Sequence, residues 1–377
     1  MLRRQRELDS TLELDRADPR LHDVLRLGAY QLRWLTRVPS HAAVSTSVEL
    51  AREAVGEGST GYVNRALRHL HRDGGRGTGD GAATHPDWLV KRWTGRYGEL
   101  ETQQLITWND TRPPLIVQPA RWSLERLEQE LQSVGVETMR ARFGSGLEVL
   151  ATRPPSRVPH PASLPGYEEG GFVVQDPAHA LVARFAAIPS GEQVYDACAA
   201  PGGKAVALEA AGARVLAGDT RHERIGRLAD TTRRAGVAIR SVAANLEAAP
   251  LRPASVAAVL VDAPCTATGT MRRHPDARWR LNATVFARMA ERQERLLAAA
   301  APLVRPGGLL IYATCSLEPE ENEQVVESFL SRHPQFSRTA PSEALPAELL
   351  TNAGDFQSLP QRHGIDGAYA ARLMRAR

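Results

Sequence analysis

Apolar residues recur at helical spacing in the first part of the chain. Leu21 and Leu25 lie four residues apart, and a spacing of three or four residues continues through 42–54 and 63–70. Residues at this spacing share one face of an α-helix, so the pattern predicts helices with a buried apolar stripe. No strand-like alternation interrupts it. We therefore expect a small all-helical domain over residues 1–75.

The middle of the chain changes its pattern twice. Residues 73–85 are rich in glycine and small polar residues, which predicts a linker. Helical spacing resumes over 87–108, and shorter segments then predict a strand at 115–118, a helix at 124–134 and a strand at 147–152. Together they predict a small α+β subdomain within residues 87–160. The proline-rich stretch 153–166 marks a second domain boundary.

Beyond residue 166, strand and helix patterns alternate. Strands are predicted at 193–196, 214–218, 239–243, 256–261 and 308–313, with helices between them. This alternation is typical of an open parallel sheet of Rossmann-like type, so we expect an α/β domain over residues 166–377. Ligands of such sheets bind outside the carboxyl ends of the strands. The residues that follow each strand are therefore the candidates for a site.

A glycine turn follows the first of these strands. The sequence DACAAPGGK, residues 196–204, places two glycines between the strand end and an Ala-rich helix. The glycines let a ligand approach the backbone, and the free N–H groups of a helix N-terminus attract anionic groups. No G-x-G-x-x-G fingerprint occurs, and Cys198 and Ala205 stand where a P-loop needs Gly and Ser or Thr. The turn predicts a nucleotide-like ligand whose class the spacing leaves open.

Several reactive or polar residues stand at the same strand ends. Cys265 and Cys315 lie in polar, turn-forming segments, which favours a functional role over a structural one. Cys198 fits either role equally well. Asp219 ends the second strand, where an acid either binds ribose hydroxyls or caps a helix. No C-x-x-C pair occurs and no histidine stands at ligand spacing from a cysteine, so no metal site is predicted.

Composition limits the remaining classes of protein. No apolar run reaches the ~18 residues that cross a membrane, and residues 1–20 lack the apolar core of a signal peptide. Three cysteines, an odd number, favour reduced thiols and a cytoplasmic protein. The net charge of +4 permits a nucleic-acid partner without requiring one. We expect no membrane association and a monomer.

Three long motifs carry a resemblance to a known family. DACAAPGGK at 196–204, DAPCTATG at 262–269 and YATCSLEPEENE at 312–323 resemble motifs of the 5-methylcytosine RNA methyltransferases, which use S-adenosylmethionine. The helical start, with LGAYQ at 27–31 and RVPSHAAV at 37–44, is similar to the NusB-like RNA-binding domain of the bacterial RsmB-type enzymes. The resemblance implies methylation of cytosine C5 in small-subunit ribosomal RNA, with S-adenosylmethionine as cofactor.

The resemblance also implies roles for individual residues. Cys315 would be the nucleophile that adds to cytosine C6, and Cys265 would assist loss of the C5 proton and release of the enzyme. Asp262 would hydrogen-bond the base, with Lys204 orienting it. The residues implied in cofactor binding are Cys198, Ala199, Ala200, Pro201, Gly202, Gly203, Lys204, Asp219, Arg224, Asn245 and Asp262.

A cluster of cations follows the second motif. Arg272, Arg273, Arg278 and Arg280 lie within nine residues, a density that predicts contacts with RNA phosphates. The same cluster is also compatible with an ordinary solvated loop.

The chain departs from the family in four places. LIVQPA at 115–120 lacks the Arg-Val-Asn usually found there, which affects an expected RNA contact. Asn245 follows the third strand where the family carries Asp, and Ala180 stands where Gln is frequent. The helical domain begins late, as though its first helices were missing, which would expose Leu25 and Leu32. Two alternatives therefore stay open. One is the same chemistry on tRNA or on another ribosomal RNA site, and the other is a catalytically silent RNA-binding or ribosome-assembly protein.

Overall fold

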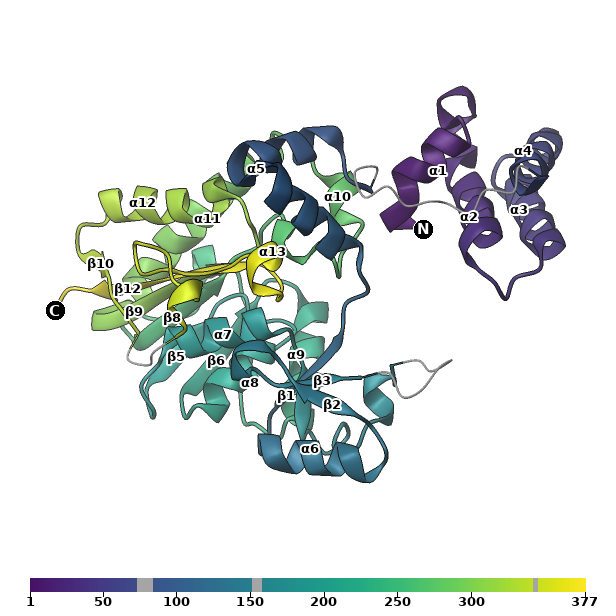
Figure 1. Ribbon diagram of the computed structural model, residues 1–377. Coiled ribbons are helices and arrows are strands. Elements are labelled where there is room, and N and C mark those ends of the chain that lie inside the picture. Colours follow the sequence, from purple (N-terminus) through teal and green to yellow (C-terminus); the bar gives the residue numbers. More distant parts are fainter. Residues whose placement is uncertain (73–83, 151–157, 342–344) are drawn as a thin grey trace. The chain divides into compact units, whose positions relative to one another are not determined.

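The structure is a computed structural model that describes residues 1–72, 84–150, 158–341 and 345–377 (Figure 1). Most of the predicted linker at 73–85 and the start of the proline-rich boundary lie outside these residues. The chain forms two compact units, Met1–Thr111 with Arg278–Arg280, and Arg112–Ala277 with Leu281–Arg377. Among the described residues, no helix has the length and apolar character needed to cross a membrane.

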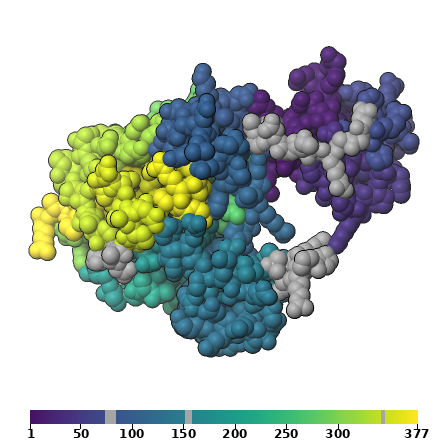
Figure 2. All heavy atoms as spheres, viewed as in Figure 1, coloured from purple at the N-terminus to yellow at the C-terminus, as the bar shows by residue number. Residues whose placement is uncertain are grey.

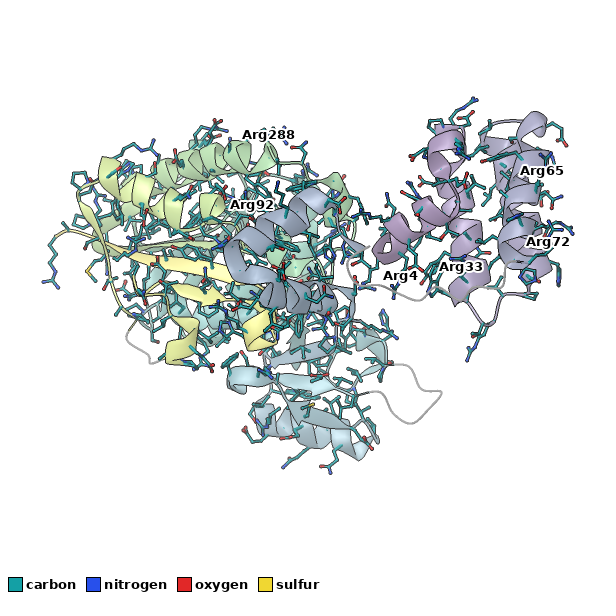
Figure 3. All side chains as sticks on the ribbon, turned by 45° about the horizontal axis from the view of Figure 1, so that its top comes forward. Arg4, Arg33, Arg65, Arg72, Arg92 and Arg288 are labelled. Atoms are coloured by element: carbon teal, nitrogen blue, oxygen red, sulfur yellow. The ribbon has the colours of Figure 1, made fainter. Side chains whose placement is uncertain are left out.

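The first unit is helical, as predicted. Its α-helices are α1 (Gln5–Thr11), α2 (His22–Trp34), α3 (Ser40–Ala54), α4 (Thr60–Arg72) and α5 (Asp87–Asp110). Leu25, Ala29, Val63 and Leu67 have no exposed surface and pack in one core. The opposite face of α4 is charged, and Figure 3 shows Arg65 and Arg72 directed away from the helix.

The expected exposure of Leu25 is wrong. Helix α1 and the turn after it bring Leu8 and Leu14 into the same core, where all three side chains are buried. Leu32 is partly buried against this core. Sequence pattern misses α1 because this short helix buries only one residue, Leu8, which creates no periodicity.

The second unit contains a small antiparallel sheet. Its strands β1 (Leu115–Pro119), β2 (Thr138–Arg140), β3 (Leu147–Val149) and β4 (Phe172–Val174) lie in the order β2-β3-β1-β4. Helix α6 (Leu124–Ser133) packs Leu127 and Leu131 into the core of this sheet. The predicted strand at 115–118 and helix at 124–134 are confirmed. In Figure 2 this α+β piece, in blue-green, and the C-terminal strands, in yellow, appear on one face.

The larger sheet confirms the Rossmann-like prediction. Its path is β10-β12-β9-β8-β5-β6-β7, with β11 paired to β12. The strands are β5 (Gln193–Asp196), β6 (Arg214–Asp219), β7 (Arg240–Ala243), β8 (Val256–Asp262), β9 (Val304–Thr314), β10 (Phe336–Arg338), β11 (Phe356–Ser358) and β12 (Ala368–Arg375). All five predicted strands are present and pair in parallel. Strand β12, which was not predicted, runs antiparallel to β9.

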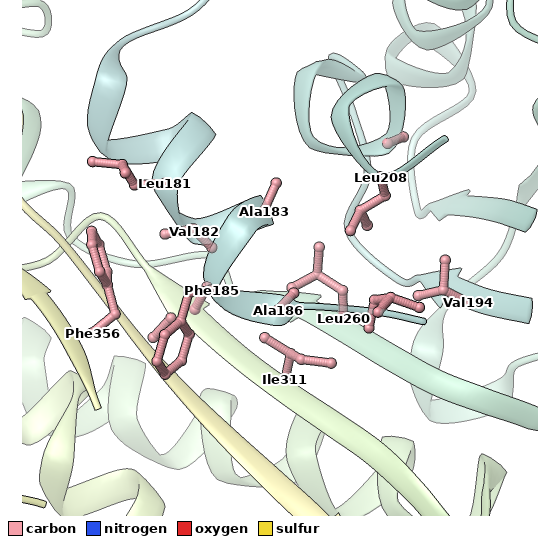
Figure 4. Close-up of a cluster of buried hydrophobic side chains, with 14 of the residues drawn as sticks. Leu181, Val182, Ala183, Phe185, Ala186, Val194, Leu208, Leu260, Ile311 and Phe356 are labelled. Carbon is pink, nitrogen blue, oxygen red and sulfur yellow. The ribbon is translucent and has the colours of Figure 1, made fainter. Parts of the chain in front are cut away.

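Helices cover both faces of this sheet (Figure 1). They are α7 (Pro177–Ala186), α8 (Gly203–Ala210), α9 (His222–Arg234), α11 (Val285–Ala300) and α12 (Glu323–Arg332). The four-residue helices α10 (Ala277–Arg280) and α13 (Pro360–His363) lie in connecting segments. Side chains alternate between two cores because successive strand residues point to opposite faces. Leu260 and Ile311 pack beneath α7 and α8 (Figure 4), whereas Val261 and Tyr312 pack in the second core with residues of α11 and α12. A parallel sheet buried on both faces gathers its carboxyl ends at one edge.

We expect Leu8→Ala to loosen the helical core around Leu25. Truncating a fully buried leucine removes about 2–5 kcal/mol of stability, and Leu8 is 1% exposed. Amide hydrogen exchange within α2 should therefore accelerate in the full chain. Leu35→Ala is the matched control, since Leu35 is 40% exposed. Equal protection of α2 in both variants would show that α1 does not complete this core.

Candidate active site

The glycine turn after β5 forms the floor of the site. Ala197 N–H donates to Leu260 O and Ala199 N–H donates to Gly218 O, which ties the turn to the neighbouring strands β8 and β6. Gly202 adopts a positive φ of 111°, a conformation that L side chains rarely adopt. A Cβ at Gly203 would lie 2.8 Å from the Gln175 amide. These constraints place Lys204 in the first turn of α8, directed at the carboxyl edge of the sheet.

One cavity lies at the ends of β6 and β7. Its volume is about 460 Å³, and its lining includes the predicted cofactor residues Cys198, Asp219, Arg224 and Asn245. Asp219 is 2% exposed, and its Oδ2 makes no hydrogen bond with the described residues. Arg224 lies 3.5 Å from that oxygen and donates to Ala200 O at 2.9 Å. A buried acceptor beside a cation suits a ligand that offers hydroxyl groups.

Asn245 caps a short turn in the wall of this cavity. Its Oδ1 accepts a hydrogen bond from Glu247 N–H at 3.2 Å and so caps the short 3₁₀ turn Leu246–Ala248. The side chain therefore sits on the cavity wall in a fixed orientation, with its amide nitrogen 3.4 Å from the Glu247 carboxylate.

A second cavity adjoins the other side of the glycine turn. Its volume is about 630 Å³, and it contains the predicted residues Ala199, Ala200, Pro201, Gly203, Lys204 and Asp262. The predicted cofactor residues are thus divided between two cavities, with the turn as the wall between them.

Lys204 and Asp262 form an ion pair in the second cavity. Lys204 Nζ lies 2.7 Å from Asp262 Oδ2, and the Lys204 side chain is only 10% exposed. Burial alone would lower the pKa of this lysine, but the Asp262 carboxylate outweighs burial and raises it. The lysine therefore remains charged and holds the Asp262 carboxylate at the mouth of the cavity.

His179, which no sequence motif selected, completes this group. Its Nδ1 accepts a hydrogen bond from Lys204 Nζ at 3.3 Å. Burial, reinforced by the Lys204 charge, lowers the pKa of His179 to about 3. The ring is therefore neutral at physiological pH and acts as an acceptor.

The two predicted catalytic cysteines lie in contact. Cys265 Sγ is 3.1 Å from Cys315 Sγ, and Cys315 N–H donates to Cys265 Sγ at 3.3 Å. The hydrogen bond with Cys315, followed by burial, raises the pKa of Cys265 well above its ordinary value. Cys265 therefore keeps its proton, and its thiol can donate to Cys315 Sγ.

Glu321, which the sequence did not single out, joins the two cysteine loops. Its carboxylate accepts hydrogen bonds from the Thr266 N–H at 2.9 Å, from the Thr266 hydroxyl, and from the Ser316 hydroxyl at 2.5 Å. Gln293 Nε2 donates a further bond at 3.0 Å. Thr266 follows Cys265 and Ser316 follows Cys315, so this carboxylate helps to fix the separation of the two thiols. The bonds from Gly269 N–H to Cys315 O and from Leu317 N–H to Thr268 Oγ1 join the same loops. The acid-rich run after Cys315 was the available signal.

The structure corrects the prediction of four phosphate-binding arginines. Arg273 pairs with Asp176 at 2.7 Å and Asp366 at 2.5 Å, and Arg278 is unexposed and pairs with Asp110 at 2.9 Å. Arg272 is 8% exposed and donates to Arg112 O. These three guanidiniums stabilise the fold because they satisfy buried acceptors. Arg280 alone among the four is exposed.

Comparison with known proteins agrees with this geometry. The family described as 16S rRNA methyltransferase RsmB/F matches residues 185–374, the NusB family matches 1–72, and an RsmF/B-like ferredoxin-like domain matches 85–152. The probable ribosomal RNA small subunit methyltransferase B of Synechocystis is 34% identical, over 100% of this chain and 89% of its own length. The Vibrio cholerae ribosomal RNA small subunit methyltransferase B is 32% identical, over 93% and 80%. The solved structure of PH0851 has a TM-score of 0.81 and 26% identity, and covers 99% of this chain and 88% of that one.

We expect Glu321→Ala to destabilise the second unit. The substitution leaves the Thr266 N–H buried without its acceptor, and it leaves the Thr266 and Ser316 hydroxyls only the longer contacts among Thr266, Ser316 and Thr268. A buried donor left unsatisfied costs about 1–3 kcal/mol. Urea denaturation followed by circular dichroism measures the loss. Glu327→Ala, at an exposed position of α12, is the control and should change stability by less than about 0.5 kcal/mol. Similar losses in both variants would contradict the role of Glu321.

Asp196 should make stability depend on pH. Burial, with the Asp262 charge, raises the pKa of Asp196 to about 7, whereas an unfolded aspartate titrates near ~3.9. Between these values only the folded state holds the proton, so stability falls as pH rises, by up to about 1.4 kcal/mol per pH unit. Asp196→Asn should remove this dependence between pH 5 and 7. Asp230→Asn, at an exposed position, should retain it, and a wild-type slope in Asp196→Asn would refute the assignment.

Proposed function

The chain belongs to the RsmB/F family of 16S rRNA methyltransferases, and we propose that it methylates C5 of a cytosine in small-subunit ribosomal RNA. The contact between Cys265 and Cys315 carries the proposal, because a C5 reaction needs a nucleophile at C6 and help in its release. Methyl transfer to an oxygen or to an exocyclic nitrogen of RNA would require neither thiol.

The cofactor of this family, S-adenosylmethionine, supplies an electrophilic methyl group on a positively charged sulfur when it is bound. The cavity at β6 and β7 fits its adenosine part, because Asp219 presents a buried acceptor suited to ribose hydroxyls. Arg224 holds the Ala200 carbonyl of the turn, and Asn245 lies on the wall toward the base. The turn from Cys198 to Lys204 separates this cavity from the one that contains Asp262, so it would hold the reacting end.

The residues of the second cavity would activate the cytosine. The Cys315 thiolate forms a bond to C6, and the C5=C6 electron pair then becomes available at C5 for the new bond to the methyl carbon. Asp262 hydrogen-bonds the N3/N4 edge of the base and stabilises this electron-rich adduct. Lys204, 2.7 Å from Asp262, holds the carboxylate in place. The target base must leave its stack to reach these groups.

Release reverses the first step. The C5 proton departs, its electron pair re-forms the C5=C6 bond, and the bond from C6 to Cys315 Sγ breaks. Cys265 stands 3.1 Å from the departing sulfur and carries a proton. It gives that proton to Cys315 as the C6–S bond breaks, and its own sulfur receives the proton from C5. Both cysteines then end as thiols, and Cys315 becomes a thiolate again when its proton passes to solvent. The three unpaired cysteines agree with a reducing compartment, and we place the reaction in the cytoplasm.

Trapping on fluorinated RNA tests the proposal. With S-adenosylmethionine and small-subunit ribosomal RNA containing 5-fluorocytosine, the wild type should form a covalent complex that survives denaturing electrophoresis. Fluorine cannot leave as a proton does, so the methylated adduct persists. Cys315→Ala should form no complex, whereas Cys265→Ala should trap 5-fluorocytosine RNA and also accumulate an adduct on ordinary RNA. Mapping the adduct identifies the cytosine.

Other results would change the conclusion. Trapping by Cys315→Ala but not by Cys265→Ala would exchange the two roles. Trapping on tRNA alone would show that the substrate is tRNA and not small-subunit ribosomal RNA. S-adenosylmethionine binding without trapping or methyl transfer on any cytosine-containing RNA would favour an RNA-binding protein built on a methyltransferase fold.

A further inference from the structure

A third hollow continues the cavity that contains Lys204 and Asp262. Its volume is about 560 Å³, and its lining consists of Tyr167, Glu168, Arg227, Asp230, Thr231, Arg233 and Arg234. Tyr167, Thr231 and Arg234 also line the Lys204 cavity, so the two hollows adjoin. We call this hollow the α9 groove, because five of its seven residues belong to α9.

We propose that the α9 groove binds the single-stranded RNA that flanks the target cytosine. The inference rests on the proposed function and extends it by assigning a surface to the substrate. It assigns RNA binding to this groove instead of to the arginine cluster at 272–280, because three arginines of that cluster bind acceptors within the protein.

The chemistry of the groove suits a nucleic-acid strand. Its three arginines outnumber its two acids, and one acid, Asp230, is already paired with Arg233. Arg227 is exposed and has its guanidinium available to a phosphate. The Arg234 guanidinium lies 4.1 Å from the centre of the Tyr167 ring, which creates a flat cationic platform. Unstacked RNA bases stack on aromatic rings and guanidinium planes, so this platform fits a nucleotide next to the target.

The position of α9 supports the same assignment. Its first turn contributes Arg224, which contacts Asp219 and the Ala200 carbonyl at the cofactor cavity. Its last turn contributes Arg233 and Arg234 to the groove. A base that enters the Lys204 cavity leaves its neighbouring nucleotides outside, and the adjoining groove is a continuous path for them.

Removing two groove cations tests the proposal. In Arg227→Gln/Arg234→Gln, we expect the Kd for a fluorescent single-stranded fragment of small-subunit ribosomal RNA to rise about tenfold at 0.1 M salt. Each phosphate contact contributes about 0.7 to the slope of log K against log salt for single strands, so loss of the Arg227 contact should decrease the slope by about 0.7. The Kd for S-adenosylmethionine should stay unchanged, which also shows that the variant is folded. Arg227→Gln alone, at an exposed position, should give the same change in slope but a smaller rise in Kd, because it leaves the Arg234 platform in place.

Arg214→Gln is the matched control. Arg214 is exposed at the amino end of β6, the opposite edge of the sheet from both cavities. If the double variant has the same RNA affinity and the same salt slope as Arg214→Gln, the proposal is overturned. Because binding is measured apart from methyl transfer, a wild type that binds RNA through the groove but transfers no methyl group would support the groove and refute the proposed function.

Discussion

The hydrogen bonds to the buried carboxylate of Glu321 determine whether this molecule has one active site or two unrelated thiols. Cys265 and Cys315 belong to loops that follow different strands, fifty residues apart. Sheet pairing brings those loops to the same edge, with Asp262 opposite Ala313 in register. Pairing alone leaves loops free to separate, whereas a carboxylate shared by Thr266 and Ser316, together with direct bonds between the loops, holds them within a hydrogen bond of each other. The reaction that we propose for the two sulfurs depends on that separation.

The features that could be predicted from the sequence are those encoded by residues close together in the chain. Strands β5, β6, β8 and β9 contain apolar runs, and their flanking turns are visible in the chain itself. The glycine turn and the two cysteines could be predicted for the same reason, because each directly follows such a run. Parallel pairing then places strand ends together without further information. The location of the candidate site therefore followed from local patterns and one rule of topology, whereas the roles of its residues came from the resemblance to the family.

The missed features depend on partners that are distant in sequence. Arg273 finds its acids 93 and 97 residues away, and Arg278 finds Asp110 across 168 residues. A run of arginines looks the same in sequence whether it meets solvent or buried carboxylates, and only the fold distinguishes the two cases. His179 was missed for a similar reason, since Lys204 reaches it from another helix. Strand β12 was missed because its residues lie in the final segment, beyond the alternation of strand and helix.

Charge at the carboxyl edge explains how one turn can separate two ligands. Asp196, Asp219 and Asp262 face Lys204 and Arg224 there, so the fully ionised cluster carries a net charge of −1. Without a ligand, burial raises the pKa of Asp196 to about 7, and protonation there brings the cluster toward neutrality. A ligand with a net positive charge, such as S-adenosylmethionine, would instead favour the ionised form of Asp196. The cluster thus pairs with the charge of the methyl donor, while the exposed arginines of α9 remain available to the polyanionic RNA. Two partners of opposite charge can then approach the same turn from its two sides.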